Sequence, residues 1–137
     1  MAIKDFKDKL TDLTPDKRKL FAELLERKQN LKRTQDAEKD FLSFVKFLWP
    51  DFVEGTHHRI IAEKFNRIAD GTLKRLIVNM PPRHTKSEFA SFMLPSFIMG
   101  RNPLTKIIQT SHTAELSQRF GRKTKNLIDS PEYKKIF

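Results

Sequence analysis

Residues 76–99 constrain the fold more than any other segment, because they place a short apolar run, a basic loop and a long apolar run one after another. The tripeptide Leu-Ile-Val at 76–78 is apolar on both faces, which is typical of a strand covered on both sides in a parallel sheet. The run from Ser87 to Met99 is long enough for a helix, which Pro95 is expected to kink or split. A strand joined to a helix by a short loop favours an α/β fold.

The chain beyond this segment continues the alternation. Residues 106–110 (Lys-Ile-Ile-Gln-Thr) are expected to form a second strand, and Thr113 can cap a helix that runs to Ile128. We expect that helix to close at the sequence Asp-Ser-Pro of residues 129–131. The order strand, loop, helix, strand, helix predicts a parallel sheet with helices packed on it.

Helices are expected before the first strand, over residues 15–28, 41–48 and 57–70. The first begins with a hydroxyl, a proline and an acid at residues 14–16, which together form a helix-start signal. In the second, one face carries Phe41, Phe44, Val45 and Leu48, a spacing that favours a packed core face over base stacking. Residues 29–39 are polar and charged, which leaves open either a linker or a solvated extension of the first helix.

The net charge of +10 is concentrated in residues 41–137, which hold 16 basic and 8 acidic groups, whereas residues 1–40 hold 11 and 9. Such an excess favours phosphate-bearing partners, and an ordinary solvated basic surface accounts for it equally well. The chain has no cysteine, so disulfides and thiolate zinc sites are excluded and a reducing compartment fits. No apolar run approaches the roughly 20 residues of a membrane span, and the N-terminus is not a secretory signal.

Residues 80–87, Met-Pro-Pro-Arg-His-Thr-Lys-Ser, have the layout of a phosphate-binding loop. Such a loop needs converging backbone N–H groups, a helix that begins there, a lysine for the terminal phosphates and a hydroxyl for Mg²⁺. Lys86 and Ser87 supply the last two. The common pattern G-x-x-x-x-G-K-[ST] has glycine where this chain has Met80 and Thr85, and spacing alone leaves open a basic turn that binds nothing.

The loop and its flanks resemble the large subunits of tailed-bacteriophage terminases, which are DNA-packaging motors. The resemblance is carried by LIVNMPPRHTKSE at 76–88, FLSFVKFLWPDFVEGTHHR at 41–59 and IIQTSHTAELSQRFGRKTK at 107–125. In that family Pro-Pro-Arg-His often precedes the Lys-Ser, and the glycine rule is relaxed. The resemblance implies that residues 40–137 are the first portion of an ASCE/RecA-like P-loop NTPase domain with an incomplete parallel sheet, and that residues 1–39 are a polar, helical region before it.

The same resemblance assigns roles within the loop. Lys86 is implied to bind the β- and γ-phosphates of ATP during catalysis, and Ser87 to hold Mg²⁺. Arg83 is a candidate for a catalytic arginine acting on the γ-phosphate, with a surface- or DNA-facing charge as the alternative. The implied nucleotide-binding residues are Pro82, Arg83, His84, Thr85, Lys86, Ser87, Glu88 and His58. The last matches a position that often contacts adenine in the family, and a helix-start histidine without a ligand is the alternative.

For the whole motor, the resemblance implies ATP hydrolysis that drives double-stranded DNA into a capsid, in the cytoplasm of the host cell. The implied partners are the portal protein, the small terminase subunit and further copies in a ring. The later acidic strand end and the nuclease domain of the family are not found in these 137 residues. We therefore expect an N-terminal portion that is inactive alone, from a parent that is an ATP hydrolase and an endonuclease.

The predicted helix after Thr113 carries four basic residues that suit a DNA phosphate track, a neighbouring subunit or a plain solvated face: Arg119, Arg122, Lys123 and Lys125. Two other functions stay open. One is another loop-containing ATPase, such as a helicase. The other is a non-catalytic basic DNA-binding module.

Overall fold

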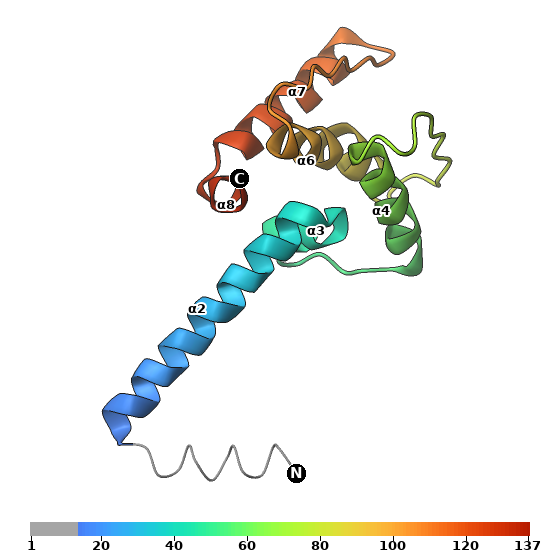
Figure 1. The fold of residues 1–137 in the computed structure, drawn as a ribbon. Coiled ribbons are helices and arrows are strands. Elements are labelled where there is room, and N and C mark those ends of the chain that lie inside the picture. Colours follow the sequence, from blue (N-terminus) through green and yellow to red (C-terminus); the bar gives the residue numbers. More distant parts are fainter. Residues whose placement is uncertain (1–13) are drawn as a thin grey trace. The chain divides into compact units, whose positions relative to one another are not determined.

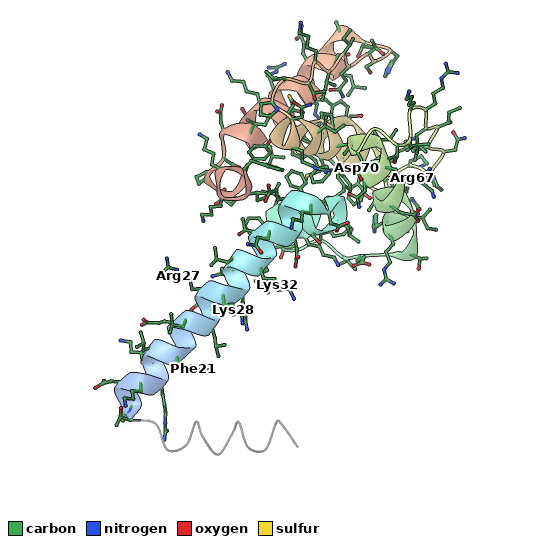
Figure 2. The ribbon with its side chains drawn as sticks, viewed as in Figure 1. Phe21, Arg27, Lys28, Lys32, Arg67 and Asp70 are labelled. Carbon is green, nitrogen blue, oxygen red and sulfur yellow. The ribbon has the colours of Figure 1, made fainter. Side chains whose placement is uncertain are left out.

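The computed structural model describes residues 14–137, and the chain divides into two units, residues 1–33 and 34–137. Helix α2 (Pro15–Lys39) begins in the first unit and continues into the second. The solvated extension is therefore the correct alternative for residues 29–39, which are rich in good helix formers and contain neither glycine nor proline. Figure 2 shows Arg27, Lys28 and Lys32 standing off this helix. The part of the expected N-terminal region before residue 14 lies outside the described residues.

The second unit consists of helices joined by irregular connecting segments (Figure 1). They are α3 (Phe41–Leu48), α4 (Thr56–Ala69), α5 (Lys86–Glu88), the π-helix η1 (Phe89–Met93), α6 (Leu94–Arg101), α7 (Ala114–Asp129) and α8 (Pro131–Ile136). The helices expected near 41–48, 57–70 and 114–128 are confirmed. Across residues 14–137, no helix combines the length and the apolarity needed to cross a membrane.

Helix α8 was not expected, because the sequence around it was interpreted only as a helix stop. Ser130 caps the new helix, since its hydroxyl accepts a hydrogen bond from the Tyr133 amide at 3.3 Å. Pro131 occupies the first turn, where the missing N–H costs nothing. A hydroxyl followed by proline is the same start signal that was identified before α2.

The predicted α/β fold is wrong: residues 14–137 form no strand and no sheet. The two expected strands, residues 76–78 and 106–110, are irregular connecting segments and form no backbone ladder. A strand exists only where a second segment lies alongside to pair its N–H and C=O groups. Within the described residues, neither segment has such a neighbour, so the apolar runs do not build a sheet.

The expectation that the first apolar run is covered on both faces is also wrong. Val78 and Met80 pack against the core, whereas Ile77, directly before Val78, is 87% exposed. In the second run, Ile108 is 91% exposed. Both runs therefore expose apolar side chains to solvent, and apolar composition alone did not distinguish this arrangement from burial on two sides.

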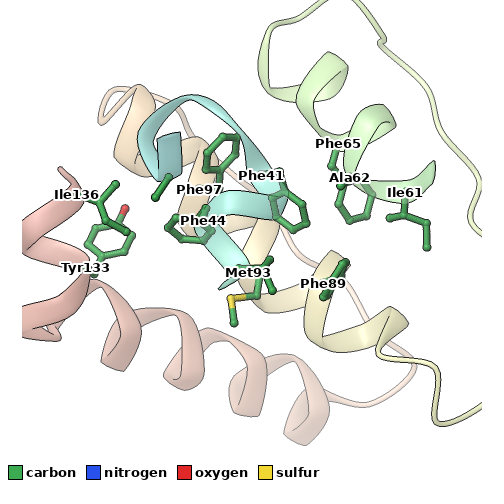
Figure 3. Close-up of a cluster of buried hydrophobic side chains, with 12 residues drawn as sticks. Phe41, Phe44, Ile61, Ala62, Phe65, Phe89, Met93, Phe97, Tyr133 and Ile136 are labelled. Carbon is green, nitrogen blue, oxygen red and sulfur yellow. The ribbon is translucent and has the colours of Figure 1, made fainter. Parts of the chain in front are cut away.

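Figure 3 shows the core, in which α3 lies among side chains of α4, of the helical run 89–101 and of α8. Phe41 is fully buried and meets three other rings edge-on, those of Phe65, Phe89 and Phe97, at centroid distances of 5.2, 5.4 and 5.7 Å. Edge-to-face contacts of this kind add to the free energy of burial. The predicted inner face of α3 is thus confirmed.

A polar brace joins the beginning of α3 to the last turn of α4. Asp40 caps α3 by accepting a hydrogen bond from the Ser43 amide at 2.8 Å. Asn66 of α4 donates to the other oxygen of Asp40 at 2.7 Å and accepts from the Phe41 amide at 2.7 Å. One side chain of α4 therefore satisfies two groups at the start of α3 and fixes how the two helices meet.

The helical run 86–101 contains the expected irregularity at Pro95, in the form of a π-helical turn. Proline has no N–H to donate to the carbonyl four residues earlier, which belongs to Ser91. That carbonyl instead accepts a hydrogen bond from the Gln109 side chain at 2.9 Å. The amide of Leu94 reaches back five residues to the carbonyl of Phe89. The proline thus changes the hydrogen-bond pattern locally, and the helical run continues through it. Gln109 links the segment 106–110 to this run.

Candidate phosphate-binding loop

The loop before α5 contains two residues in left-handed backbone conformation, Arg83 with φ +64° and Thr85 with φ +59°. Thr85 has ψ of 4° and immediately precedes the first helical residue. This conformation is rare for a β-branched residue and natural for glycine. Thr85 occupies the position at which the common phosphate-loop pattern has its second glycine. The chain therefore departs from the pattern in its side chain while its backbone has the conformation that glycine favours.

This backbone turns several amides toward one side. A left-handed residue followed by a right-handed one, as at Thr85 and Lys86, forms a concavity of N–H groups of the kind that binds anions. The first hydrogen bond of the helical run is donated by the Phe89 amide to the Thr85 carbonyl at 2.9 Å. The N–H groups of residues 86–88 belong to that first turn, where an N–H has no partner within its helix.

Two cationic side chains of the loop are available at its surface. Arg83 and Lys86 are both exposed, and no hydrogen bond or ion pair engages either side chain within the part of the chain that the structure describes. His84 is also exposed, and its Nδ1 donates to the Pro82 carbonyl at 2.8 Å, which closes the turn. The loop thus presents two free positive charges beside its amides.

His58, in the first turn of α4, is hydrogen bonded to the loop. Its Nε2 lies 2.7 Å from the hydroxyl of Thr85, and that hydroxyl donates to the His84 carbonyl at 2.6 Å. The hydroxyl proton is therefore committed, so Nε2 must be the donor to it. On the other side of the ring, Nδ1 accepts from the Gly55 amide at 2.9 Å. This pattern requires a neutral imidazole with its proton on Nε2.

The surroundings of His58 favour the same neutral state. The side chain is 5% exposed and its ring packs against those of Phe52 and Phe89. Burial lowers the pKa of His58 below its usual 6.5, and the neighbouring His57 lowers it further, against an opposing effect of Glu54. Both ring nitrogens have protein partners, so a contact with adenine through either nitrogen requires one of these bonds to break.

Glu88 and Lys123 form an ion pair that divides the basic set of α7. The Lys123 Nζ lies 2.8 and 2.9 Å from the two carboxylate oxygens of Glu88 and stands over the Phe92 ring. The other three members of the set, Arg119, Arg122 and Lys125, are exposed. Lys123 is therefore engaged beside the loop helix, and the remaining cations are the ones that α7 offers to solvent.

A hollow of about 370 Å³ lies behind Lys86 and Ser87. Its remaining walls are apolar apart from one serine, and they come from α4, the segment 76–78 and the helical run: Phe65, Ile68, Leu76, Val78, Ala90, Ser91 and Leu94. Its size falls at the low end of small-molecule sites. Among residues 14–137 no group of three histidine and acidic side chains is placed to hold a metal ion.

Sequence reasoning missed two residues that shape this site, Asn66 and Gln109, and one pairing, that of His58 with Thr85. Asn66 and Gln109 act through contacts that are distant in sequence, and no local pattern signals them. The pairing of His58 with Thr85 spans 27 residues and was equally invisible. Only the glycine-position mismatch at Thr85 was a signal, because a β-branched residue at that place needs something to hold it.

Comparison with known proteins gives no further assignment: no family model, no curated protein and no solved structure matches this chain.

Proposed function

We propose that residues 82–88 bind the phosphates of ATP together with Mg²⁺, and that the chain is the ATP-binding part of a DNA-packaging motor of the terminase type. The observation that carries the proposal is the left-handed backbone of Thr85 directly before Lys86 at the start of a helical run. It turns amides, a helix beginning and a free lysine toward the same place.

The charges of the loop support the same assignment. Lys86 is suited to the β- and γ-phosphates, and Arg83 stands two residues before the left-handed Thr85, where it can reach the γ-phosphate. The negative charge of Glu88 in the first helical turn is paired with Lys123, so it repels a bound anion less than a free carboxylate would.

Mg²⁺ fits this loop as an ion carried by the nucleotide. It commonly keeps several waters and binds through substrate phosphates and one or two protein groups. The exposed hydroxyl of Ser87, next to Lys86 at the helix start, is suited to be such a group. When bound, the ion neutralises charge on the phosphates.

The wider role rests on the resemblance at residues 41–59, 76–88 and 107–125, and on the loop rather than on a sheet. In this proposal the parent protein hydrolyses ATP to move double-stranded DNA into a capsid in the host cytoplasm. Copies of the parent protein form a ring that binds the portal protein and the small terminase subunit, and the parent protein also cuts DNA. The 137-residue chain supplies nucleotide binding and is expected to show no sustained ATP turnover alone.

The test is titration with a fluorescent ATP analogue in the presence of Mg²⁺. Lys86→Ala removes a charge-assisted contact worth about 1.5–3 kcal/mol, so affinity is expected to fall by about tenfold or more. Lys74→Ala is the matched control, because Lys74 is an exposed lysine outside the loop, and it should change affinity less than twofold. Equal losses in the two variants would reduce the role of Lys86 to general charge.

The second candidate is a DNA-binding module, and the three exposed cations of α7 favour it. In that case duplex DNA binds with a steep salt dependence, while the ATP analogue does not bind at any accessible concentration. Substituting Arg119 and Arg122 together by alanine should then lower the salt slope by about two. Nucleotide binding that depends on Lys86 decides for the ATP site instead.

A further inference from the structure

We propose that His58 is a positioning residue that holds Thr85 in its left-handed conformation and so keeps the loop ready to bind phosphate. The inference rests on the proposed function, because it explains how the site exists without its glycine. It assigns to His58 a role toward the loop rather than toward the base of the nucleotide.

Thr85 adopts a backbone conformation that threonine does not favour. A left-handed β-branched residue is a true outlier, and such residues persist only where their surroundings hold them. Its φ of +59° and ψ of 4° are a left-handed conformation. A threonine free to relax would move to negative φ, and the amides that follow it would no longer face the same side.

The side chain of Thr85 is held by hydrogen bonds at its only polar atom, the hydroxyl oxygen. The hydroxyl donates to the carbonyl of His84 and accepts from His58 Nε2. The first bond is local and moves with the loop. The bond to His58 is the one that connects Thr85 to another element, α4, and so it can resist relaxation of the loop.

His58 is itself held by contacts within its own part of the fold. Its Nδ1 is bound by the Gly55 amide just before α4 begins, and its ring lies 4.8 Å from the Phe52 ring and 5.2 Å from the Phe89 ring, centre to centre. Phe89 in turn belongs to the helical run that the loop opens. His58 therefore connects the loop to the core, because it bonds to Thr85 before the helical run and packs against Phe89 within that run.

The test compares ATP with inorganic tripolyphosphate, each with Mg²⁺, as competitors of the fluorescent ATP analogue on the 137-residue chain. His58→Ala is expected to weaken both ligands by the same factor, about tenfold. Thr85→Val removes the hydroxyl while keeping a β-branched residue, leaves buried His58 in place, and should cause the same loss for both ligands. Loss of ATP affinity alone, with tripolyphosphate unchanged, would show that His58 contacts the base and would overturn the proposal.

A suppressor variant separates positioning from general structural damage. Glycine adopts positive φ without help, so His58→Ala made in a Thr85→Gly background should change the affinity of that parent less than twofold. If His58→Ala weakens binding equally in the threonine and glycine backgrounds, the coupling between the two residues is absent and the proposal fails.

A measurement without ligand keeps this inference separate from the proposed function. Positive φ gives an unusually strong nuclear Overhauser effect between the amide and α protons of the same residue. We expect it at Thr85 in the wild type, and we expect it to weaken in His58→Ala and Thr85→Val. Retention in both variants would overturn the positioning role even if ATP binds. If the effect is lost but neither phosphate ligand binds the wild type, the positioning role stands and the proposed function is rejected.

Discussion

Substitution of Phe89 by alanine tests the link between the core and the loop helix. Phe89 is 1% exposed and its ring contacts those of Phe41, Phe52 and His58 at 5.4, 5.5 and 5.2 Å. Removing a buried phenylalanine ring from a site that cannot collapse costs about 3–5 kcal/mol. Domains of this size are stable by about 5–15 kcal/mol, so the variant is expected to lose at least about a fifth of its stability.

The assay is urea unfolding followed by circular dichroism, with the free energy of unfolding taken from the midpoint and slope. Leu104→Ala is the control, because Leu104 is 89% exposed and its truncation should stay within about 0.5 kcal/mol of wild type. A loss below about 1 kcal/mol for Phe89→Ala would refute the account in which this ring joins α3, α4 and the loop helix.

Three further results are expected. Asn66→Ala leaves two groups at the start of α3 without their partner and should cost about 1–3 kcal/mol in urea unfolding, whereas Asn126→Ala on α7 should cost almost nothing. Because the pKa of His58 is lowered in the folded state, its contribution to the free energy of unfolding should be fully present above about pH 6.5 and should fall as the pH drops below it. His58→Gln should flatten this pH dependence, and an unchanged slope in the variant would contradict the prediction. Burial raises the pKa of Tyr133 to about 12, and its hydroxyl donates to the Ser96 carbonyl at 2.8 Å. The free energy of unfolding should therefore decline between about pH 10 and 12 in wild type but not in Tyr133→Phe. Loss of the hydrogen bond in Tyr133→Phe should also cost about 1 kcal/mol at neutral pH.

The helices were predictable because their signals are local. Asp40 and Thr113 cap helices where a short polar side chain precedes an apolar period, and Gly71 has φ +73° just after α4 ends. The buried face of α3 followed directly from residues at i, i+3 and i+4. Each of these needs only neighbours within one or two turns.

That residues 14–137 form no sheet could not be predicted from the same kind of information. An apolar run such as 76–78 has the composition of a strand, but pairing depends on a second segment lying beside it, which no local pattern specifies. The same holds for Gln109, which takes over the carbonyl freed by Pro95. Within the loop, the roles predicted from the sequence for Lys86 and Ser87 stay predictions, while the backbone at Thr85 and its bond to His58 came only from the folded chain.

Amide mapping by nuclear magnetic resonance tests the central claim most directly. Addition of Mg²⁺ and a non-hydrolysable ATP analogue should shift the ¹H–¹⁵N signals of Thr85, Lys86, Ser87 and Glu88 more than those of any other segment, and Lys86→Ala should reduce these shifts at the same ligand concentration. Shifts confined to α7, or no shifts in the loop at ligand concentrations that saturate known phosphate-binding loops, would contradict the claim that residues 82–88 bind the phosphates of ATP.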